Sequence, residues 1–295
     1  MTSVAVVAHS RKQIGGGLGE LRRVLASAGF TDPLWYEVIK SKQAPKQARK
    51  ALKEGADLLF VWGGDGMIQR CVDALAGTGA TLAILPAGTA NLLAANLSIP
   101  ADIEAAVHIG LHGGRRKLDL GVANGERFAV MAGTGFDALM IRDAGAGIKD
   151  RFGQLAYVWT GAKHLRERRV RMRIIVDGNT WFKGNASCAL VGNVGKVLGG
   201  IPLFDDAQPD DGRLNIGVLT ANGLWEWARA LGRTAVGQAH RSPFVKFTSG
   251  REFDIQLGRR MPYELDGGDR KATRRLHIVV EPGAVTVCVP EEVVR

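Results

Sequence analysis

The segment that most constrains the fold is the apolar run from Leu58, which ends in Gly-Gly-Asp-Gly at Gly66. A helical pattern follows at once, with apolar residues at i, i+3, i+4 and i+7 from Ile68 to Leu75. A strand that passes through glycines into a helix is typical of a parallel α/β sheet, and glycines let backbone N–H groups approach a phosphate. We therefore predict a phosphate-binding turn here. Taken alone, the same residues also suit a structural strand-to-helix turn.

The first part of the chain alternates between strand and helix patterns. Strands are predicted at 4–8, 35–39, 58–62 and 81–85, and helices at 18–28, 45–54, 67–76 and 90–96. Alternating strands and helices with short links form a parallel sheet with helices on both faces. The sequence therefore predicts an α/β domain with a doubly wound parallel sheet over residues 1–112.

After residue 112 the pattern changes to strand, turn, strand. The predicted strands are 116–122, 126–133, 169–177, 180–191, 213–219, 253–257, 276–281 and 285–289. Helical insertions are expected near 152–166 and 223–233, and hairpin turns at Asp177-Gly178-Asn179 and Pro282-Gly283. This pattern predicts an all-β C-terminal domain, an antiparallel β-sandwich over residues 113–295, whose last strands are free to return to the first domain.

Composition limits the class of protein. No apolar run approaches the roughly 20 residues that span a bilayer, and the first residues lack the pattern of a signal peptide. The 3 cysteines are odd in number and widely spaced, so neither a disulfide framework nor a zinc site is indicated. We expect a cytoplasmic protein.

The chain carries a net charge of +10, which favours anionic partners. The excess is concentrated between Lys149 and Arg173, around a stretch in which Leu155, Trp159 and Ala162 share a helical face. Charge runs of this kind usually form a solvated face, and docking on an anionic membrane surface is the more specific alternative that this segment also suits. No aromatic-interleaved platform for nucleic acid is present, so no nucleic-acid partner is predicted.

Three loops are expected at the carboxyl edge of the predicted parallel sheet, where ligands of such sheets bind. They follow the first, third and fourth strands and carry residues suited to phosphate. The candidate nucleotide contacts are His9, Ser10, Lys12, Gly63, Gly64, Asp65, Gly66, Gly88, Thr89 and Asn91. Thr89 is equally suited to capping a helix and Lys12 to solvation, but the three loops together predict nucleotide binding.

The order of the motifs resembles one family. Gly63-Gly64-Asp65-Gly66, Leu85-Pro86-Ala87-Gly88-Thr89-Ala90-Asn91 and Lys117-Leu118-Asp119-Leu120-Gly121 are similar to the motifs of the diacylglycerol kinase catalytic domain family. That family includes bacterial lipid kinases and sphingosine kinases. Asp210-Asp211-Gly212 and Leu265-Asp266-Gly267 resemble its later motifs, so the resemblance runs from about residue 3 to about residue 290.

The resemblance implies transfer of the γ-phosphoryl group of ATP to a lipid hydroxyl, with Mg²⁺ as cofactor. It places Asp65 and Asp119 near Mg²⁺-nucleotide and makes Asp266 the favoured general base, with Asp65 as a rival. Asp210 and Asp211 resemble a second Mg²⁺ site, although an Asp-Gly turn explains them equally well. Asp266, too, has the alternative of a turn aspartate before two glycines.

Several positions depart from the commonest pattern of the family: Met67, Gln69, Arg70, Leu92 and Gly268. Together these departures remove one hydroxyl and up to three carboxylates from around the site. They leave open a catalytically silent lipid- or nucleotide-binding protein of the same fold. An NAD kinase-like enzyme is a further alternative. The expected partners are a lipid substrate and, peripherally, the inner membrane face; the sequence also leaves a homodimer open.

Overall fold

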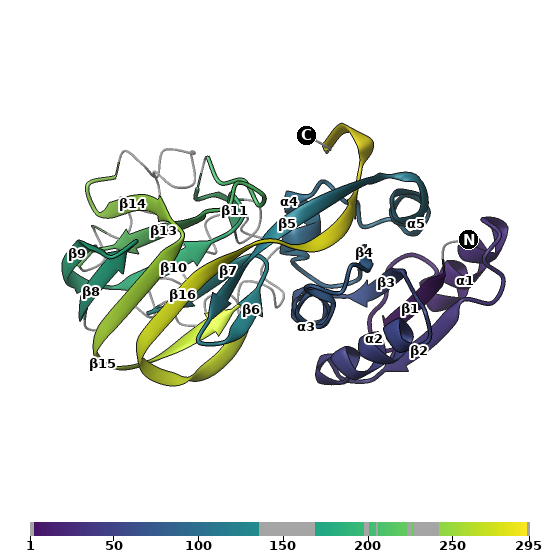
Figure 1. Cartoon of the computed structure of the whole chain (residues 1–295), viewed down its shortest axis with the longest axis horizontal. Coiled ribbons are helices and arrows are strands. Elements are labelled where there is room, and N and C mark those ends of the chain that lie inside the picture. Colours follow the sequence, from purple (N-terminus) through teal and green to yellow (C-terminus); the bar gives the residue numbers. More distant parts are fainter. Residues whose placement is uncertain are drawn as a thin grey trace. The chain divides into compact units, whose positions relative to one another are not determined.

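The computed structural model describes residues 3–135, 169–197, 201–204, 206–222, 226 and 242–293 (Figure 1). The chain forms two compact units. Unit 1 comprises Met1–Leu120 together with Pro282–Arg295, and unit 2 comprises Gly121–Glu281. The two boundaries fall within strands β5 (Gly114–Ala123) and β16 (Gly268–Val289).

Unit 1 is built on a parallel sheet. Strands β1 (Val4–His9), β2 (Leu34–Val38), β3 (Leu58–Gly63) and β4 (Thr81–Pro86) lie in the order β2-β1-β3-β4, and the end of β16 pairs with β4. Every residue of β1 and β3 is buried, as expected for central strands covered on both faces. The predicted doubly wound parallel sheet is confirmed.

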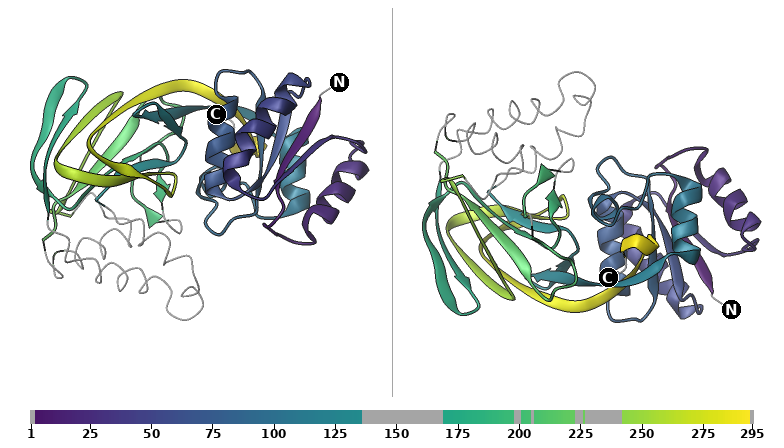
Figure 2. Two further views of the ribbon diagram at one scale, coloured as in Figure 1. Left: turned by 90° about the horizontal axis from the view of Figure 1, so that it is seen from below. Right: turned by 90° about the horizontal axis from the view of Figure 1, so that it is seen from above.

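Helices cover both faces of this sheet (Figures 1 and 2). Helices α1 (Gly17–Ser27) and α5 (Ile103–His112) contact each other, as do α2 (Ala44–Lys53) and α3 (Asp65–Leu75). Short η1 (Ser41–Gln43) and α4 (Leu92–Asn96) complete the unit. Helix α5 was not predicted. Its start is capped by Asp102, whose carboxylate accepts the Ala105 N–H at 2.8 Å.

The strand pairings that the structure describes within unit 2 are antiparallel, which confirms the predicted all-β class. Its strands are β6 (Glu126–Phe128), β7 (Met131–Thr134), β8 (Val170–Val176), β9 (Asn179–Ala186), β10 (Cys188–Gly192), β11 (Lys196–Val197), β12 (Ile201–Pro202), β13 (Leu214–Leu219), β14 (Val245–Gly250) and β15 (Glu252–Leu265). A last short helix, η3 (Glu291–Val293), follows in unit 1.

Along one edge, strand β15 pairs with two different strands. Its first half pairs with β8, its last residues pair with β7, and register shifts lie between Gln256 and Tyr263. Such irregularities bend a strand and let it take part in two layers. The core between the layers includes Val170, Met172 and Ile174 from β8, Val191 from β10 and Ile216 from β13.

One predicted hairpin turn is confirmed and the other is wrong. Asp177 and Gly178, both with positive φ, form a two-residue turn between β8 and β9. At Pro282-Gly283 the chain does not turn back, because β16 continues from its pairing with β15 to a parallel pairing with β4. Gly283, with φ of 57°, donates its N–H to Asp119 Oδ1 instead.

The predicted helical insertions near 152–166 and 223–233 lie largely outside the described residues. None of the helices in the described part of the chain is long and apolar enough to span a bilayer. The 3 cysteines, Cys71, Cys188 and Cys288, are buried free thiols.

Candidate functional site

Two glycine loops at the carboxyl edge of the unit 1 sheet meet backbone to backbone. The loop after β3 and the loop after β4 are joined by a hydrogen bond from Ala87 N–H to Gly63 O at 2.9 Å. A Cβ added at Gly88 would lie 2.5 Å from the Cα of Gly64, so neither position has space for a side chain without displacement of the other loop. These glycines therefore allow a close approach that brings two sets of backbone N–H groups together.

Asp65 fastens the same two loops. Its Oδ1 accepts the N–H of Leu92, the first residue of α4, in a short hydrogen bond. Burial raises the pKa of the Asp65 carboxyl, while hydrogen bonds from backbone N–H groups around Leu92 oppose that shift. The carboxylate thus lies at the junction of the two loops, where it is suited to an electrostatic role beside a bound anion and its cation.

Asn91 shapes the second loop from within. Its Oδ1 accepts the Gly88 N–H at 2.8 Å, and its Nδ2 donates to Gly88 O at 3.0 Å and more weakly to Pro86 O at 3.4 Å. Asn91 has φ of 47°, a left-handed conformation that asparagine tolerates better than most residues. Thr89 is exposed beside it.

The loop after β1 is held by its own hydrogen bonds. The Nδ1 of His9 accepts the Arg11 N–H at 3.3 Å, and Trp62 Nε1 on β3 donates to Lys12 O at 3.0 Å. Burial, followed by the charge of Lys12, lowers the pKa of His9 and favours the neutral imidazole. The hydroxyl of Ser10 donates to Val38 O at 3.3 Å, and its backbone N–H donates there too, which ties this loop to β2.

The described carboxylates of unit 1 do not form a metal site from protein ligands alone. Asp119 is buried and its Oδ1 accepts the Gly283 N–H at 2.7 Å. Among the described residues, no group of three or more His, Cys, Asp or Glu side chains is arranged to hold a metal ion. Because Mg²⁺ is ordinarily held by one or two carboxylates and by substrate phosphates, the residues fit a Mg²⁺ that arrives with a nucleotide.

Asp210 and Asp211 lie in an exposed turn of unit 2 before β13. The Oδ1 of Asp211 accepts the Arg213 N–H at 2.9 Å, the usual hydrogen bond of an aspartate turn. The turn carries Gly212 with φ of 73°. This geometry agrees with the turn that the sequence analysis gave as one alternative, and the metal role remains a prediction.

Asp266 occupies the tight turn between β15 and β16 in unit 2, with φ of 46°. Its carboxylate is buried and accepts three backbone N–H groups, from Ala129 at 2.8 Å, Val130 at 2.9 Å and Met131 at 2.8 Å. Those bonds also explain why the strand predicted over 126–133 is divided into β6 and β7. The Asp266 side chain therefore has a structural role, in addition to any role in catalysis.

Sequence reasoning missed Glu264, two residues before Asp266. Its side chain is 2% exposed, and both carboxyl oxygens lack a hydrogen-bond partner in the part of the chain that the structure describes. Burial, followed by the charges of Asp269 and Asp266, raises the pKa of Glu264 to about 8. No motif contains it. Because Leu265 is buried, alternation along β15 predicts an exposed side chain at the preceding position, whereas Glu264 is buried in the structure.

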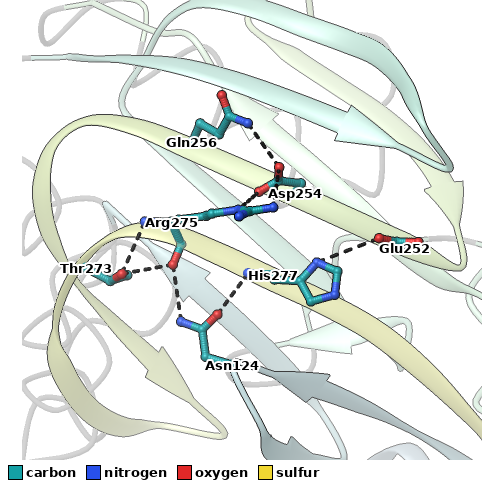
Figure 3. A network of polar contacts seen from close by, with 7 residues as sticks. All are labelled: Asn124, Glu252, Asp254, Gln256, Thr273, Arg275 and His277. Atoms are coloured by element: carbon teal, nitrogen blue, oxygen red, sulfur yellow. Dashed lines mark hydrogen bonds and ion pairs between the residues drawn. The ribbon is translucent and has the colours of Figure 1, made fainter.

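A second polar cluster in unit 2 is internally paired (Figure 3). Asn124 bonds the backbone of Arg275 and His277, and Asp254 accepts bonds from Arg275 at 2.7 Å and Gln256 at 3.0 Å. Although burial opposes ionisation of Asp254, the bonds from Arg275 and Gln256 outweigh it and lower the pKa. These hydrogen bonds therefore link β15 and β16 to each other and to the turn at Asn124, which indicates a structural role.

Two family models match the chain in sequence order. Residues 6–123 match the diacylglycerol kinase catalytic domain, and residues 130–289 match the YegS C-terminal NAD kinase beta sandwich-like domain. Together they span most of both units.

Curated relatives match over most of their length. A diacylglycerol kinase of Bacillus subtilis is 30% identical over 228 residues, which is 76% of this chain and 75% of that protein. A probable lipid kinase YegS-like protein of Pseudomonas syringae is 28% identical over 257 residues, with 84% of this chain and 80% of that protein covered.

Solved structures share the fold. A putative diacylglycerol kinase from Bacillus anthracis superposes with a TM-score of 0.80 at 23% identity and covers 99% of this chain and 97% of that one. An NAD kinase from Archaeoglobus fulgidus in complex with ATP is more distant, with a TM-score of 0.56, 10% identity, and 98% and 95% of the two chains covered.

Proposed function

This chain belongs to the diacylglycerol kinase catalytic domain family, and from that premise we propose that it transfers the γ-phosphoryl group of ATP to a hydroxyl of diacylglycerol or a related lipid. The observation that carries the proposal is the pair of glycine loops held together by Asp65 and Asn91. Phosphoryl transfer depends on positioning and charge neutralisation, and a rigid phosphate cradle supplies the positioning.

In this proposal the nucleotide binds at the carboxyl edge of the unit 1 sheet. The contacts are those of the three loops, from His9 to Lys12, from Gly63 to Gly66 and from Gly88 to Asn91. Backbone N–H groups and the charge of Lys12 suit the phosphates of ATP. The neutral His9 is suited to a hydrogen bond rather than to charge pairing.

Bound Mg²⁺ would neutralise charge on the phosphates. We assign Asp65 and Asp119 to it as carboxylate ligands, and we keep Asp210 and Asp211 as the proposed second Mg²⁺ site. The hydrogen bond from Leu92 orients the Asp65 carboxylate before any cation arrives.

We propose Asp266 as the general base for the lipid hydroxyl, with Asp65 as the rival. A carboxylate can take this role within hydrogen-bond reach of the hydroxyl. The three backbone bonds to Asp266 make its replacement a structural change as well as a chemical one. A loss of activity on substitution therefore needs a structural control before it identifies the base.

Access to a lipid requires contact with a membrane surface, and we propose that the protein is cytoplasmic and docks reversibly at the inner membrane face. Of the basic segment between Lys149 and Arg173, residues 149–168 lie outside the described part of the chain. Arg171 and Arg173 on β8 are exposed. Their charges suit anionic headgroups. A homodimer would bring two such surfaces to one membrane.

A catalytically silent binding protein is the second candidate, because Met67 replaces a hydroxyl of the commonest family pattern. The Met67 side chain is buried, and its sulfur would lie 2.8 Å from a Cβ added at Gly63. It therefore fills space beside the loop rather than presenting a polar group to a ligand. An NAD kinase-like activity has weaker support, since its structural relative shares only the fold.

The deciding experiment is incubation with labelled ATP, Mg²⁺ and a total lipid extract, followed by identification of the labelled product. Labelled phosphatidic acid or another phosphorylated lipid is the expected result, and the Asp65→Asn variant should produce none. Nucleotide binding without any labelled lipid would favour the silent protein. Label in NADP⁺ when NAD⁺ is added would favour the NAD kinase-like alternative.

A further inference from the structure

The buried carboxyl group of Glu264 calls for an explanation. Buried polar groups in native proteins are nearly always hydrogen-bonded, and an unpaired one destabilises the folded state. Glu264 is 2% exposed, and neither oxygen has a partner among the described residues. A group retained at that cost is suited to a hydrogen-bonding partner that the described residues do not supply.

The surroundings define the chemistry of such a partner. Glu264 pairs in register with Gly133 of β7 and with Asp269 of β16. A Cβ added at Gly133 would lie 3.3 Å from Glu264 Oε1 and 2.5 Å from the side chain of Leu190, so the glycine leaves room for the carboxyl group beside an apolar neighbour. The neighbours named here therefore combine an aliphatic side chain and a glycine with acidic groups, and sites for small, mostly apolar ligands likewise combine apolar contacts with a few polar groups that fix the ligand's orientation.

The negative charges around Glu264 disfavour an anionic ligand and leave an uncharged ligand group as the better partner. Asp266 and Asp269 both act on Glu264 with negative charge, and burial keeps its carboxyl group largely protonated near pH 7. The described residues contain no group of three His, Cys, Asp or Glu side chains that could hold a metal ion there. A protonated carboxyl group both donates and accepts, which matches an uncharged hydroxyl.

We propose that Glu264 binds the lipid substrate by a hydrogen bond to its free hydroxyl, and so selects a lipid that carries one. The inference rests on the proposed function for the identity of the ligand. It adds a substrate-binding residue in unit 2 that none of the recognised motifs contains.

The test is a binding cycle between one side chain and one ligand hydroxyl, carried out without ATP. The two probes are 1,2-dioctanoylglycerol and propane-1,2-diol dioctanoate, which differ only in the free hydroxyl. The two variants are Glu264→Met, which removes hydrogen bonding at similar size, and Glu264→Gln, which keeps it without charge. Glu252→Met, at an exposed position of the same strand, is the matched control.

We expect the wild type and Glu252→Met to bind dioctanoylglycerol at least about tenfold more tightly than the deoxy probe, because a buried polar partner is left unpaired by the latter. Glu264→Met should bind the two probes equally, and its ligand-free Tm should rise, since an unpaired buried carboxyl group is gone. Glu264→Gln should keep most of the preference.

Equal binding of the two probes by the wild type would overturn the inference, even if Glu264→Met failed to fold. So would an unchanged preference in Glu264→Met. Turnover assays separate this result from the proposed function. Hydroxyl-selective binding without phosphorylation would support the role of Glu264 and refute the proposed kinase activity. Phosphorylation with the same lipid KM in wild type and Glu264→Met would support the kinase activity and refute the role of Glu264.

Discussion

The carboxylate of Asp65 accepts a hydrogen bond from the backbone N–H of Leu92, 27 residues later in the chain. Leu92 stands where an aspartate often follows the asparagine in the family pattern. The contact uses the backbone N–H, which an aspartate at this position would also offer, so the departure at Leu92 leaves this hydrogen bond intact. The bond couples the first turn of α3 to the first turn of α4 and so links the two glycine loops.

The close approach of the loops predicts different effects on stability for alanine substitutions at Gly88 and Gly66. Gly88→Ala should lower the free energy of unfolding by about 1–3 kcal/mol, because its Cβ would meet the Cα of Gly64 at 2.5 Å. Gly66→Ala has open space and should leave stability unchanged. Thermal or urea unfolding measures both, and equal losses would contradict the packing argument.

Asp65→Asn should retain the fold and lose function. An amide oxygen can still accept the Leu92 N–H, but the negative charge is gone. We expect turnover to be abolished and Mg²⁺-ATP affinity to fall, as for loss of a metal carboxylate. Nucleotide titration and turnover assays would be compared with Asp32→Asn, an exposed change in the same unit. Normal Mg²⁺-ATP affinity in Asp65→Asn would speak against a metal role.

Asp266→Asn should depress kcat by about 10²- to 10⁴-fold while leaving ATP affinity normal, if Asp266 is the base. The same change puts an NH₂ group against a backbone donor, at a cost of about 1–3 kcal/mol in stability. Asn193→Ala is the structural control, because it removes the Nδ2 bond to Ala129 O at 3.1 Å. An equal fall in kcat in that variant would assign Asp266 to structure alone.

Glu264 should make stability depend on pH. Its pKa is raised from 4.5 to about 8 in the folded protein, so the folded state holds a proton that the unfolded state releases. Stability is therefore fully present below about pH 4.5 and is lost as the pH rises through about 8, by roughly 3–5 kcal/mol. The difference in unfolding free energy between wild type and Glu264→Gln, measured from pH 5 to pH 9, isolates this effect. A constant difference would refute it.

Charge reversal on β8 tests membrane docking. Arg171→Glu with Arg173→Glu should weaken binding to anionic vesicles at least about tenfold at low salt, since each basic residue near the surface contributes about 1 kcal/mol. Arg23→Glu with Lys42→Glu makes the same change in net charge at exposed positions of unit 1. Co-sedimentation that falls equally in both double variants would indicate a general charge effect instead of a docking surface.

Apart from α5, which was missed, most local elements of unit 1 were predictable because their signals are local. The apolar runs of β1 and β3, and the periodicity of α3, each lie within a dozen residues. The glycine loops were predictable for the same reason. Their contact was not, because the meeting of Gly64 and Gly88 depends on which strands are neighbours in the sheet.

Long-range pairing explains what the sequence did not reveal. Asp266 binds N–H groups about 135 residues earlier, and nothing near Ala129 to Met131 indicates an interrupted strand. Pro282-Gly283 has the composition of a turn, yet β4 offers a parallel partner that keeps the strand extended. Glu264 was missed because its unusual feature, the lack of a partner, appears only when every neighbour is placed.

The course of β16 bears on how the chain is made. Unit 2 is one continuous segment and has left the ribosome once Glu281 has emerged, whereas the unit 1 sheet still lacks the strand that pairs with β4. Until Thr286 and Val287 arrive, β4 has an unpaired edge of the kind that promotes aggregation. The sheet encoded first is thus the last to close, and a premature stop just after Glu281 would release a chain with that edge permanently open.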